Sequence, residues 1–223
     1  EIVECIKKNI SNNKANKYFF NEDYNFVSME NDFFYYEDKY GSLKIPKPGM
    51  SGQFQLENAS TAIASLRVLE NLKIRDEQII KGIKNAYNSA RLEEIKSGKL
   101  KDLVKNNTLI IDSSHNPGGS KALNEYLQTL NCNKHIIVGM MENKDHEKFI
   151  NYFKNISSLT VIDIPNQANA ISGKKLKEKF KKFKNLNYVK NIEQALKSLQ
   201  LEKNDIILIT GSIYLAGEVL NLN

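Results

Sequence analysis

With 223 residues, 41% of them hydrophobic, the chain can bury one substantial core, or one domain and part of another. This composition excludes an intrinsically disordered chain, and no apolar run approaches the roughly 20 residues that a membrane-spanning helix needs. The formal net charge of +6 comes mostly from lysines spread along the chain, without a basic groove interleaved with aromatic residues. We therefore expect no nucleic-acid partner and no membrane partner.

The cysteines indicate the cellular compartment of the protein, and the first residues indicate whether the chain is a fragment. Cys5 and Cys132 are too few and too far apart in sequence for a metal site or a disulfide framework, which favours a reducing, cytoplasmic setting. Residues 1–9 lack a signal-peptide pattern. Because the chain starts at Glu1 rather than Met, within what reads as structure, we expect a fragment of a longer protein.

The first third of the chain predicts a helix, a small antiparallel meander and two further helices. The helix covers 2–11, and the β-prone runs are 17–20, 25–29, 32–36 and 42–45, with turn residues at 30–31 and 38–41. A helix after Gly52 should bury Ala59, Ile63, Leu66 and Leu69, and Asp76 should cap a helix over 77–87.

From residue 92 the pattern alternates between strand and helix. The expected strands are 92–95, 109–112, 135–140, 159–164, 187–190 and 206–210, and the expected helices are 117–130, 144–155, 172–184, 191–200 and 213–221. This alternation predicts the α/β class, with a mostly parallel sheet and helices on both faces.

The loop after the 109–112 strand is the most informative stretch. Asn116 suits a helix N-cap and Pro117 a first helical turn, so the loop should offer free backbone N–H groups at the carboxyl end of the strand. Asp112 and His115 should then face a crevice that favours anions, rather than a core. For an isolated D-x-x-H, the alternative that Asp112 turns the chain and His115 is a surface histidine stays equally open.

A resemblance favours the functional alternative. The run D-S-S-H-N-P-G-G at 112–119 resembles the D-x-A-H-N-P signature of folylpolyglutamate synthases and dihydrofolate synthases, the folate branch of the Mur ligase superfamily, with Ser114 where Ala is usual. Four further matches follow the order of the family: residues 52–59 (G-x-H-Q-x-x-N-A, with Phe54 for His), 90–93 (G-R-x-E, with Ala90 for Gly), 139–145 (G-M-x-x-D-K-D) and 211–215 (G-S-x-Y-L).

The resemblance implies an ATP-dependent amide ligase. ATP would phosphorylate a dihydropteroate or folate carboxylate, and the amine of L-glutamate would attack the acyl phosphate. The implied nucleotide-binding residues are Asn58, Arg91 and Asp112, the implied catalytic residue is His115, acting on glutamate or the intermediate, and the implied glutamate-binding residues are Ser212 and Tyr214.

The phosphate-binding part of such an enzyme is missing from the sequence. No G-x-x-G-K-[ST] loop occurs, and the magnesium ligands of the family lie upstream of this chain, so we assign no metal ligand. We expect residues 1–88 to be the C-terminal part of the ATP-binding domain and 89–223 to be a Mur ligase C-terminal domain. We also expect this chain to be monomeric and, alone, inactive.

Two other interpretations remain. A peptidoglycan Mur-type amino-acid ligase shares the architecture and the chemistry, although its equivalent loops usually lack the H-N-P run. A stand-alone nucleotide- or amino-acid-binding module is the non-enzyme alternative. The resemblance applies equally to enzymes that accept dihydropteroate, folate or both.

Overall fold

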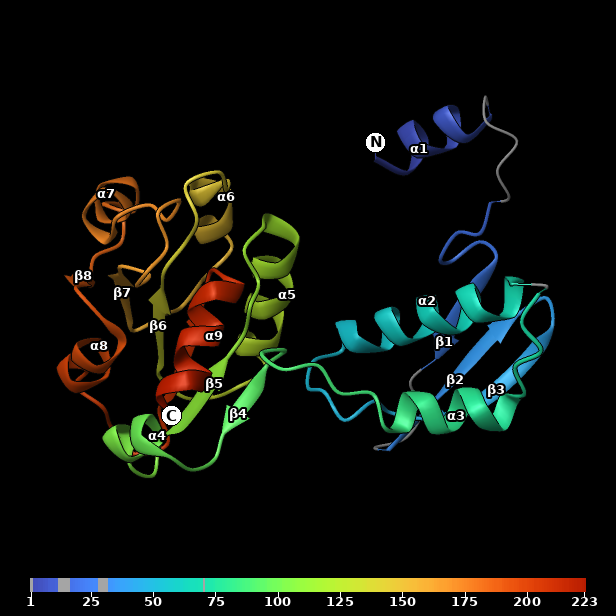
Figure 1. Ribbon diagram of the computed structural model, residues 1–223, viewed down its shortest axis with the longest axis horizontal. Coiled ribbons are helices and arrows are strands. Elements are labelled where there is room, and N and C mark those ends of the chain that lie inside the picture. Colours follow the sequence, from blue (N-terminus) through green and yellow to red (C-terminus); the bar gives the residue numbers. More distant parts are fainter. Residues whose placement is uncertain (1, 12–16, 28–31, 70) are drawn as a thin grey trace. The chain divides into compact units, whose positions relative to one another are not determined.

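The computed structural model describes residues 2–11, 17–27, 32–69 and 71–223, and it divides into two compact units (Figure 1). Unit 1 contains residues 1–49 and 53–87, and unit 2 contains residues 50–52 and 88–223. Each unit has a hydrophobic core of its own.

Unit 1 is a three-stranded antiparallel sheet in the order β1-β2-β3, with helices packed on one face. Its elements are α1 (Ile2–Ser11), β1 (Tyr24–Val27), β2 (Phe33–Asp38), β3 (Gly41–Pro46), α2 (Phe54–Val68) and α3 (Asp76–Lys84). Along β2, Phe34 and Tyr36 are fully buried, whereas Phe33 and Tyr35 are partly exposed. This alternation creates one apolar face, which α2 and α3 cover.

The meander is confirmed with three strands, but the expected run 17–20 is not one of them. It contributes only an isolated bridge from Phe20 to Tyr24. A tight turn begins at once, with Asn21 at φ 65° and its N–H donating to Tyr24 O at 2.8 Å, so no ladder can extend. Residues 28–29 of the second expected run and the expected turn 30–31 lie outside the described residues.

Two details of the helices in unit 1 also differ from expectation. Leu69 follows the last residue of α2 and is 49% exposed, so it does not belong to the buried face. Asp76 is the first residue of α3 rather than its cap. The residue before it, Arg75, donates its backbone N–H to Gln78 Oε1 at 2.9 Å, which satisfies the start of the helix.

Unit 2 is a six-stranded sheet in the order β4-β5-β9-β6-β7-β8, parallel except for β4, which confirms the predicted class. Its elements are β4 (Glu93–Ile95), α4 (Lys99–Val104), β5 (Thr108–Ile111), α5 (Pro117–Gln128), β6 (Lys134–Val138), α6 (His146–Asn151), β7 (Ser158–Ile162), α7 (Gly173–Lys179), β8 (Leu186–Val189), α8 (Ile192–Ser198), β9 (Ile206–Thr210) and α9 (Ile213–Leu222).

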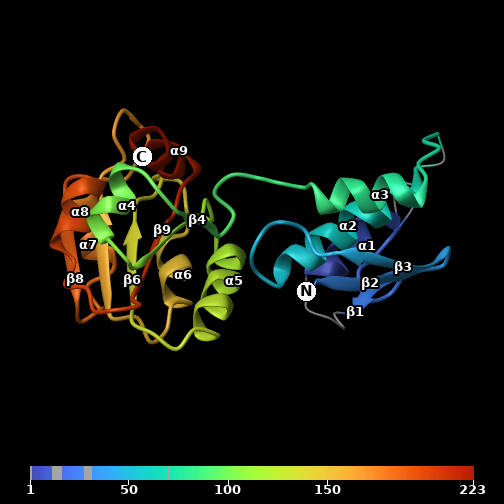
Figure 2. The same ribbon diagram turned by 90° about the horizontal axis from the view of Figure 1, so that it is seen from below.

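Helices cover both faces of this sheet, as Figure 2 shows with α4 and α9 on one side and α5 and α6 on the other. The chain runs from β5 to β8 through α5, α6 and α7, and it returns through α8 to β9, which lies between β5 and β6. Leu109, Ile111, Ile207 and Ile209 pack in one core with α4, α8 and α9. No described helix has the length and apolar character needed to cross a membrane.

Helix α4 was not expected from the sequence. Its N-terminus follows Gly98, which has no side chain to cap it. Instead Asn223 Oδ1 accepts the N–H groups of Leu100 at 3.1 Å and Lys101 at 3.3 Å. The cap comes from a residue more than 100 positions away, so no local pattern could reveal it.

Candidate functional site

The carboxyl ends of β5, β9 and β6 are tied together by hydrogen bonds. Gly211 N–H, after β9, donates to Ser114 O, after β5, at 3.0 Å, and Gly139 N–H, after β6, donates to Thr210 O at 3.3 Å. Thr210 Oγ1 also donates to Ser114 O at 3.3 Å. Three loops that are distant in sequence therefore leave the sheet side by side, at the edge where open parallel sheets bind ligands.

A cavity of about 670 Å³ lies over this edge. The loops after β5, β6, β7 and β9 all line it, and it brings together three residues that the sequence predicts: His115, Ser212 and Tyr214. Lys144 and Lys175 also line it. The sequence marks the loop 139–145 without singling out Lys144, and Lys175 falls in a lysine-rich run that is typical of a solvated helix face.

The loop that carries His115 has the expected cap. Asn116 Oδ1 accepts Gly119 N–H at 2.8 Å, and Pro117 begins α5. His115 is half-buried, and its Nδ1 lies 3.1 Å from Ser113 O. Because a carbonyl oxygen can only accept, Nδ1 carries the hydrogen, and Nε2 is the proton-accepting nitrogen of the neutral ring. The hydrogen bond from Nδ1 to Ser113 O thus fixes the orientation of the ring, and Nε2 can act on a ligand.

Ser212 and Tyr214 begin the last helix. Ser212 is 2% exposed, and its Oγ accepts Tyr214 N–H at 3.1 Å, which caps α9. The hydroxyl hydrogen of Ser212 can still donate to a ligand atom. Tyr214 is 50% exposed, so its ring forms an accessible wall of the cavity.

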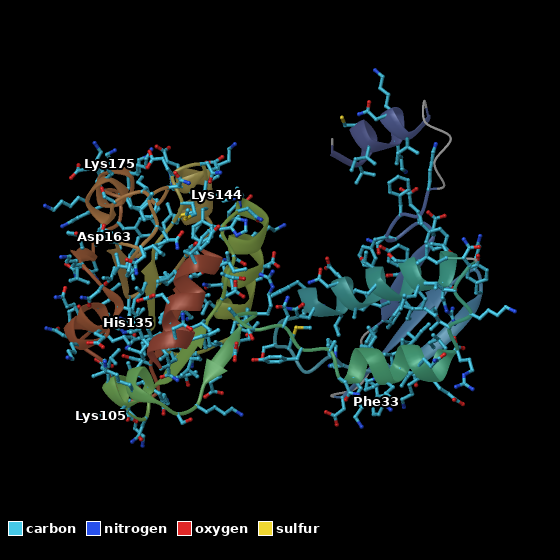
Figure 3. All side chains as sticks on the ribbon, viewed as in Figure 1. Phe33, Lys105, His135, Lys144, Asp163 and Lys175 are labelled. Carbon is cyan, nitrogen blue, oxygen red and sulfur yellow. The ribbon has the colours of Figure 1, made fainter. Side chains whose placement is uncertain are left out.

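The charged groups around the cavity are two lysines and one glutamate. In the described part of the chain, neither Lys144 nor Lys175 belongs to an ion pair. Both lie at the upper end of unit 2 in Figure 3, whereas Lys105 lies at its lower end. Glu142 lines the same cavity. Two ammonium groups and one carboxylate on a common surface complement a ligand with two carboxylates and one amine.

The loop that carries Glu142 and Lys144 is held in place at several points. His146 is buried, and its Nε2 donates to Met141 O at 2.9 Å. Glu142 N–H donates to Asn169 O at 2.9 Å. Asp145 caps α6, since its Oδ1 accepts Lys148 N–H at 3.1 Å, and the hydrogen bond from the Lys148 side chain lowers the pKa of the Asp145 carboxyl. The loop is therefore preorganised.

Asp112 does not face the crevice as expected. It is 1% exposed, its Oδ2 accepts Leu92 N–H at 2.9 Å, and its Oδ1 accepts Ser114 N–H at 2.8 Å. The expectation that Asp112 lies outside a core is wrong, because the carboxylate turns back to satisfy the backbone of its own loop and of the segment before β4.

Arg91 lies in that same segment. It is half-buried, and its Nη1 donates to Ser113 Oγ at 2.7 Å. Its neighbours Ala90 and Leu92 have positive φ values, 56° and 45°. Arg91 does not line the cavity that holds His115. The structure thus links Arg91 with the Asp112 loop, and His115 with Ser212 and Tyr214.

Asn58 belongs to unit 1. It is exposed on α2, and its Nδ2 donates to Gln55 Oε1 at 3.0 Å. Gln55 is 4% exposed, and its Nε2 has no partner among the described residues. An unsatisfied buried donor costs about 1–3 kcal/mol, so a polar ligand atom at the start of α2 would be stabilising.

A metal ion would need a cluster of ligands. Among the described residues, no group of three or more His, Cys, Asp or Glu side chains is placed to hold one. The resemblance implies that the magnesium ligands lie upstream of this chain, and we derive no step through the ion.

Solved structures share this fold at low sequence identity. E. coli FolC in complex with ADP is 21% identical with a TM-score of 0.77, covering 97% of this chain and 50% of that chain. Mycobacterium tuberculosis folylpolyglutamate synthase, complexed with ADP and AMPPCP, is 18% identical with a TM-score of 0.83, covering 99% and 52%. A bifunctional folylpolyglutamate synthase/dihydrofolate synthase with Mn, AMPPNP and L-glutamate bound is 20% identical with a TM-score of 0.78, covering 98% and 50%.

The chain thus spans about half the length of these solved structures. No curated protein sequence gives a significant match. The family model described as "Mur ligase, glutamate ligase domain" matches residues 90–213, which is more than half of the chain and contains every strand-end loop of the cavity. The chain therefore belongs to the Mur ligase family, through its glutamate ligase domain.

Proposed function

We propose that this chain is the C-terminal part of an ATP-dependent ligase that adds L-glutamate to dihydropteroate or to folyl substrates. Unit 2 would bind glutamate, and unit 1 would be the end of the ATP-binding domain. The charge pattern of the cavity carries the proposal: Lys144 and Lys175 complement two carboxylates, and Glu142 complements an amine.

The reaction needs two steps. The substrate carboxylate first attacks the γ-phosphorus of ATP and forms an acyl phosphate, with ADP as leaving group. The glutamate amine then attacks the acyl carbon, phosphate leaves, and the amine loses a proton. Such chemistry depends on positioning and charge neutralisation.

In this scheme His115 acts on the glutamate side. Its Nε2 can accept the proton of the attacking amine, while the hydrogen bond between Nδ1 and Ser113 O fixes the ring. Ser212 would donate its hydroxyl hydrogen to a glutamate carboxylate, and Tyr214 would wall the site. His115, Ser212 and Tyr214 belong to one cavity, which supports assigning them to one ligand.

In unit 2, Arg91 would bind nucleotide phosphate, and in unit 1, Asn58 is a separate candidate for nucleotide binding. A guanidinium forks onto phosphate oxygens, and an exposed amide beside a buried unsatisfied amide suits a polar base edge. Asp112 would contribute to nucleotide binding indirectly. Its two oxygens accept the N–H groups of Leu92 and Ser114, and these bonds fix the backbone next to Arg91.

An NMR titration of the isotope-labelled chain tests glutamate binding. L-glutamate should cause saturable shifts at the amides of His115, Lys144 and Ser212, and L-glutamine, which lacks the second carboxylate, should cause weaker ones. Lys175→Ala should weaken glutamate binding at least tenfold. Lys174→Ala, its neighbour outside the cavity, is the matched control.

Two outcomes would redirect the proposal. Absence of saturable shifts with L-glutamate would refute the assignment of this cavity. Stronger binding of D-glutamate than of L-glutamate would favour a peptidoglycan-type amino-acid ligase over the folate branch.

A further inference from the structure

The segment Ala90–Glu93, here called the strap, has an unusual backbone. Ala90 at φ 56° and Leu92 at φ 45° flank Arg91, and both lie in the left-handed region that residues with a Cβ rarely adopt. Two such residues around one arginine persist only when the surroundings determine them. The strap therefore needs specific partners.

Two carboxylates supply those partners. Glu93 Oε2 accepts Ala90 N–H at 2.7 Å, and Asp112 Oδ2 accepts Leu92 N–H at 2.9 Å. Ser113 N–H closes the strap from the other side by donating to Ala90 O at 2.9 Å. Each left-handed residue thus has its N–H on a charged acceptor, and hydrogen bonds of this kind are stronger than neutral ones.

Among the described residues, neither carboxylate forms an ion pair with the arginine. In the described chain, Arg91 forms no ion pair, and its Nη1 donates to the neutral hydroxyl of Ser113. Two acids close in space would normally pair with a guanidinium. Here Glu93 Oε2 and both oxygens of Asp112 accept from the backbone, and the charge of Arg91 stays available to an external anion.

We infer that Glu93, together with Asp112, is a positioning residue for Arg91: their carboxylates hold the left-handed bends that present the guanidinium. The inference rests on the proposed function in one respect only, that Arg91 meets phosphate. Glu93 itself acts through the hydrogen bond that its Oε2 accepts from the backbone of the strap.

The test uses the labelled 223-residue chain and four variants. Couplings between amide and α protons report φ at Ala90 and Leu92, and the Arg91 side-chain resonance reports binding of inorganic tripolyphosphate. Glu93→Ala should abolish the positive-φ couplings at Ala90 and weaken the tripolyphosphate response at least tenfold. Glu93→Gln, which keeps an acceptor oxygen, should restore most of both.

Asp112→Asn should disturb Leu92 in the same way, and Glu94→Ala, an exposed neighbour on β4, is the control that should change nothing. If Glu93→Ala does not fold, the coupling across the hydrogen bond from Ala90 N–H to the Glu93 carboxylate can be measured in the parent, and its absence overturns the inference.

The outcomes separate this inference from the proposed function. An unchanged φ at Ala90 and an unchanged tripolyphosphate response in Glu93→Ala refute the positioning role. In a second outcome, tripolyphosphate does not shift the Arg91 resonance of the parent chain, but Glu93→Ala still abolishes the positive-φ couplings at Ala90. This result would refute the phosphate role of Arg91 and support the role of Glu93 in shaping the strap.

Discussion

Asp112 divides its carboxylate oxygens between two segments of backbone, one in its own loop and one in the strap. The residue is buried, yet it satisfies two N–H groups that would otherwise lack an acceptor. Asp112 thus shapes the backbone of both segments. The effect of replacing it should then appear in folding stability as well as in activity.

We predict that Asp112→Asn destabilises unit 2. The amide has one acceptor oxygen for two N–H groups, and a lost hydrogen bond to a charged acceptor costs about 1.5–3 kcal/mol. Urea unfolding followed by a unit 2 probe measures this change. His115→Ala is the comparison, since the imidazole is half-buried and its one hydrogen bond among the described residues is to Ser113 O. Equal stability of Asp112→Asn and the parent would contradict the buried geometry.

The pH dependence of stability tests Asp145, which ends the loop that carries Lys144. The hydrogen bond from the Lys148 side chain and the α6 cap lower the pKa of the Asp145 carboxyl. A carboxyl whose pKa is lower in the folded chain stabilises the fold above the unfolded pKa of about 4, and this contribution disappears as the pH falls through the folded pKa.

Asp145→Asn, which keeps a capping oxygen without the charge, should therefore be less stable than the parent at pH 6 and equally stable once the pH is below the folded pKa. Urea midpoints at several pH values measure the difference, and 1 M salt should reduce it. A difference that does not change with pH would show that the charge of Asp145 contributes nothing.

At the scale of elements, the floor of the cavity depends on the close approach of the loops after β6 and β9. Gly211 has φ +109°, and a Cβ there would lie 2.6 Å from Gly139 O. No side chain can be accommodated unless these loops separate. The hydrogen bond from Gly211 N–H to Ser114 O would be lost with them.

We predict that Gly211→Ala destabilises unit 2 by about 3 kcal/mol, from backbone strain and overpacking together. The matched control is Gly217→Ala within α9, where a Cβ meets nothing within 4 Å. That change should stabilise by about 0.5–1 kcal/mol, because alanine favours a helix. Denaturant unfolding compares the two variants, and a neutral Gly211→Ala would show that the loops can separate freely.

At the scale of the whole molecule, the chain matches the glutamate ligase domain over residues 90–213, but its sequence contains no G-x-x-G-K-[ST] phosphate loop. We predict that the 223-residue chain, given ATP, magnesium, L-glutamate and dihydropteroate, releases no ADP above background. A coupled ADP assay measures this, with a complete folylpolyglutamate synthase as positive control. Measurable turnover by the chain would contradict the proposal that it is one part of a larger enzyme.

Local patterns were sufficient for much of the architecture of this protein. Strand and helix alternation from residue 92 determined the parallel sheet, because apolar periodicity reflects which side chains must be buried. The same local chemistry determined the Asn116 cap and the approach of His115, Ser212 and Tyr214, since strand ends in a parallel sheet share one edge.

Only the tertiary structure decided features that depend on residues far apart in the chain. It buried Asp112, whose carboxylate accepts a backbone N–H of the strap. It also brought Lys175 to the cavity and capped α4 with Asn223. The run 17–20 failed to become a strand for a related reason, because β propensity is satisfied only where a partner strand is available. Sequence patterns encode burial and local caps, whereas the partner of a buried polar group is chosen by the fold that surrounds it.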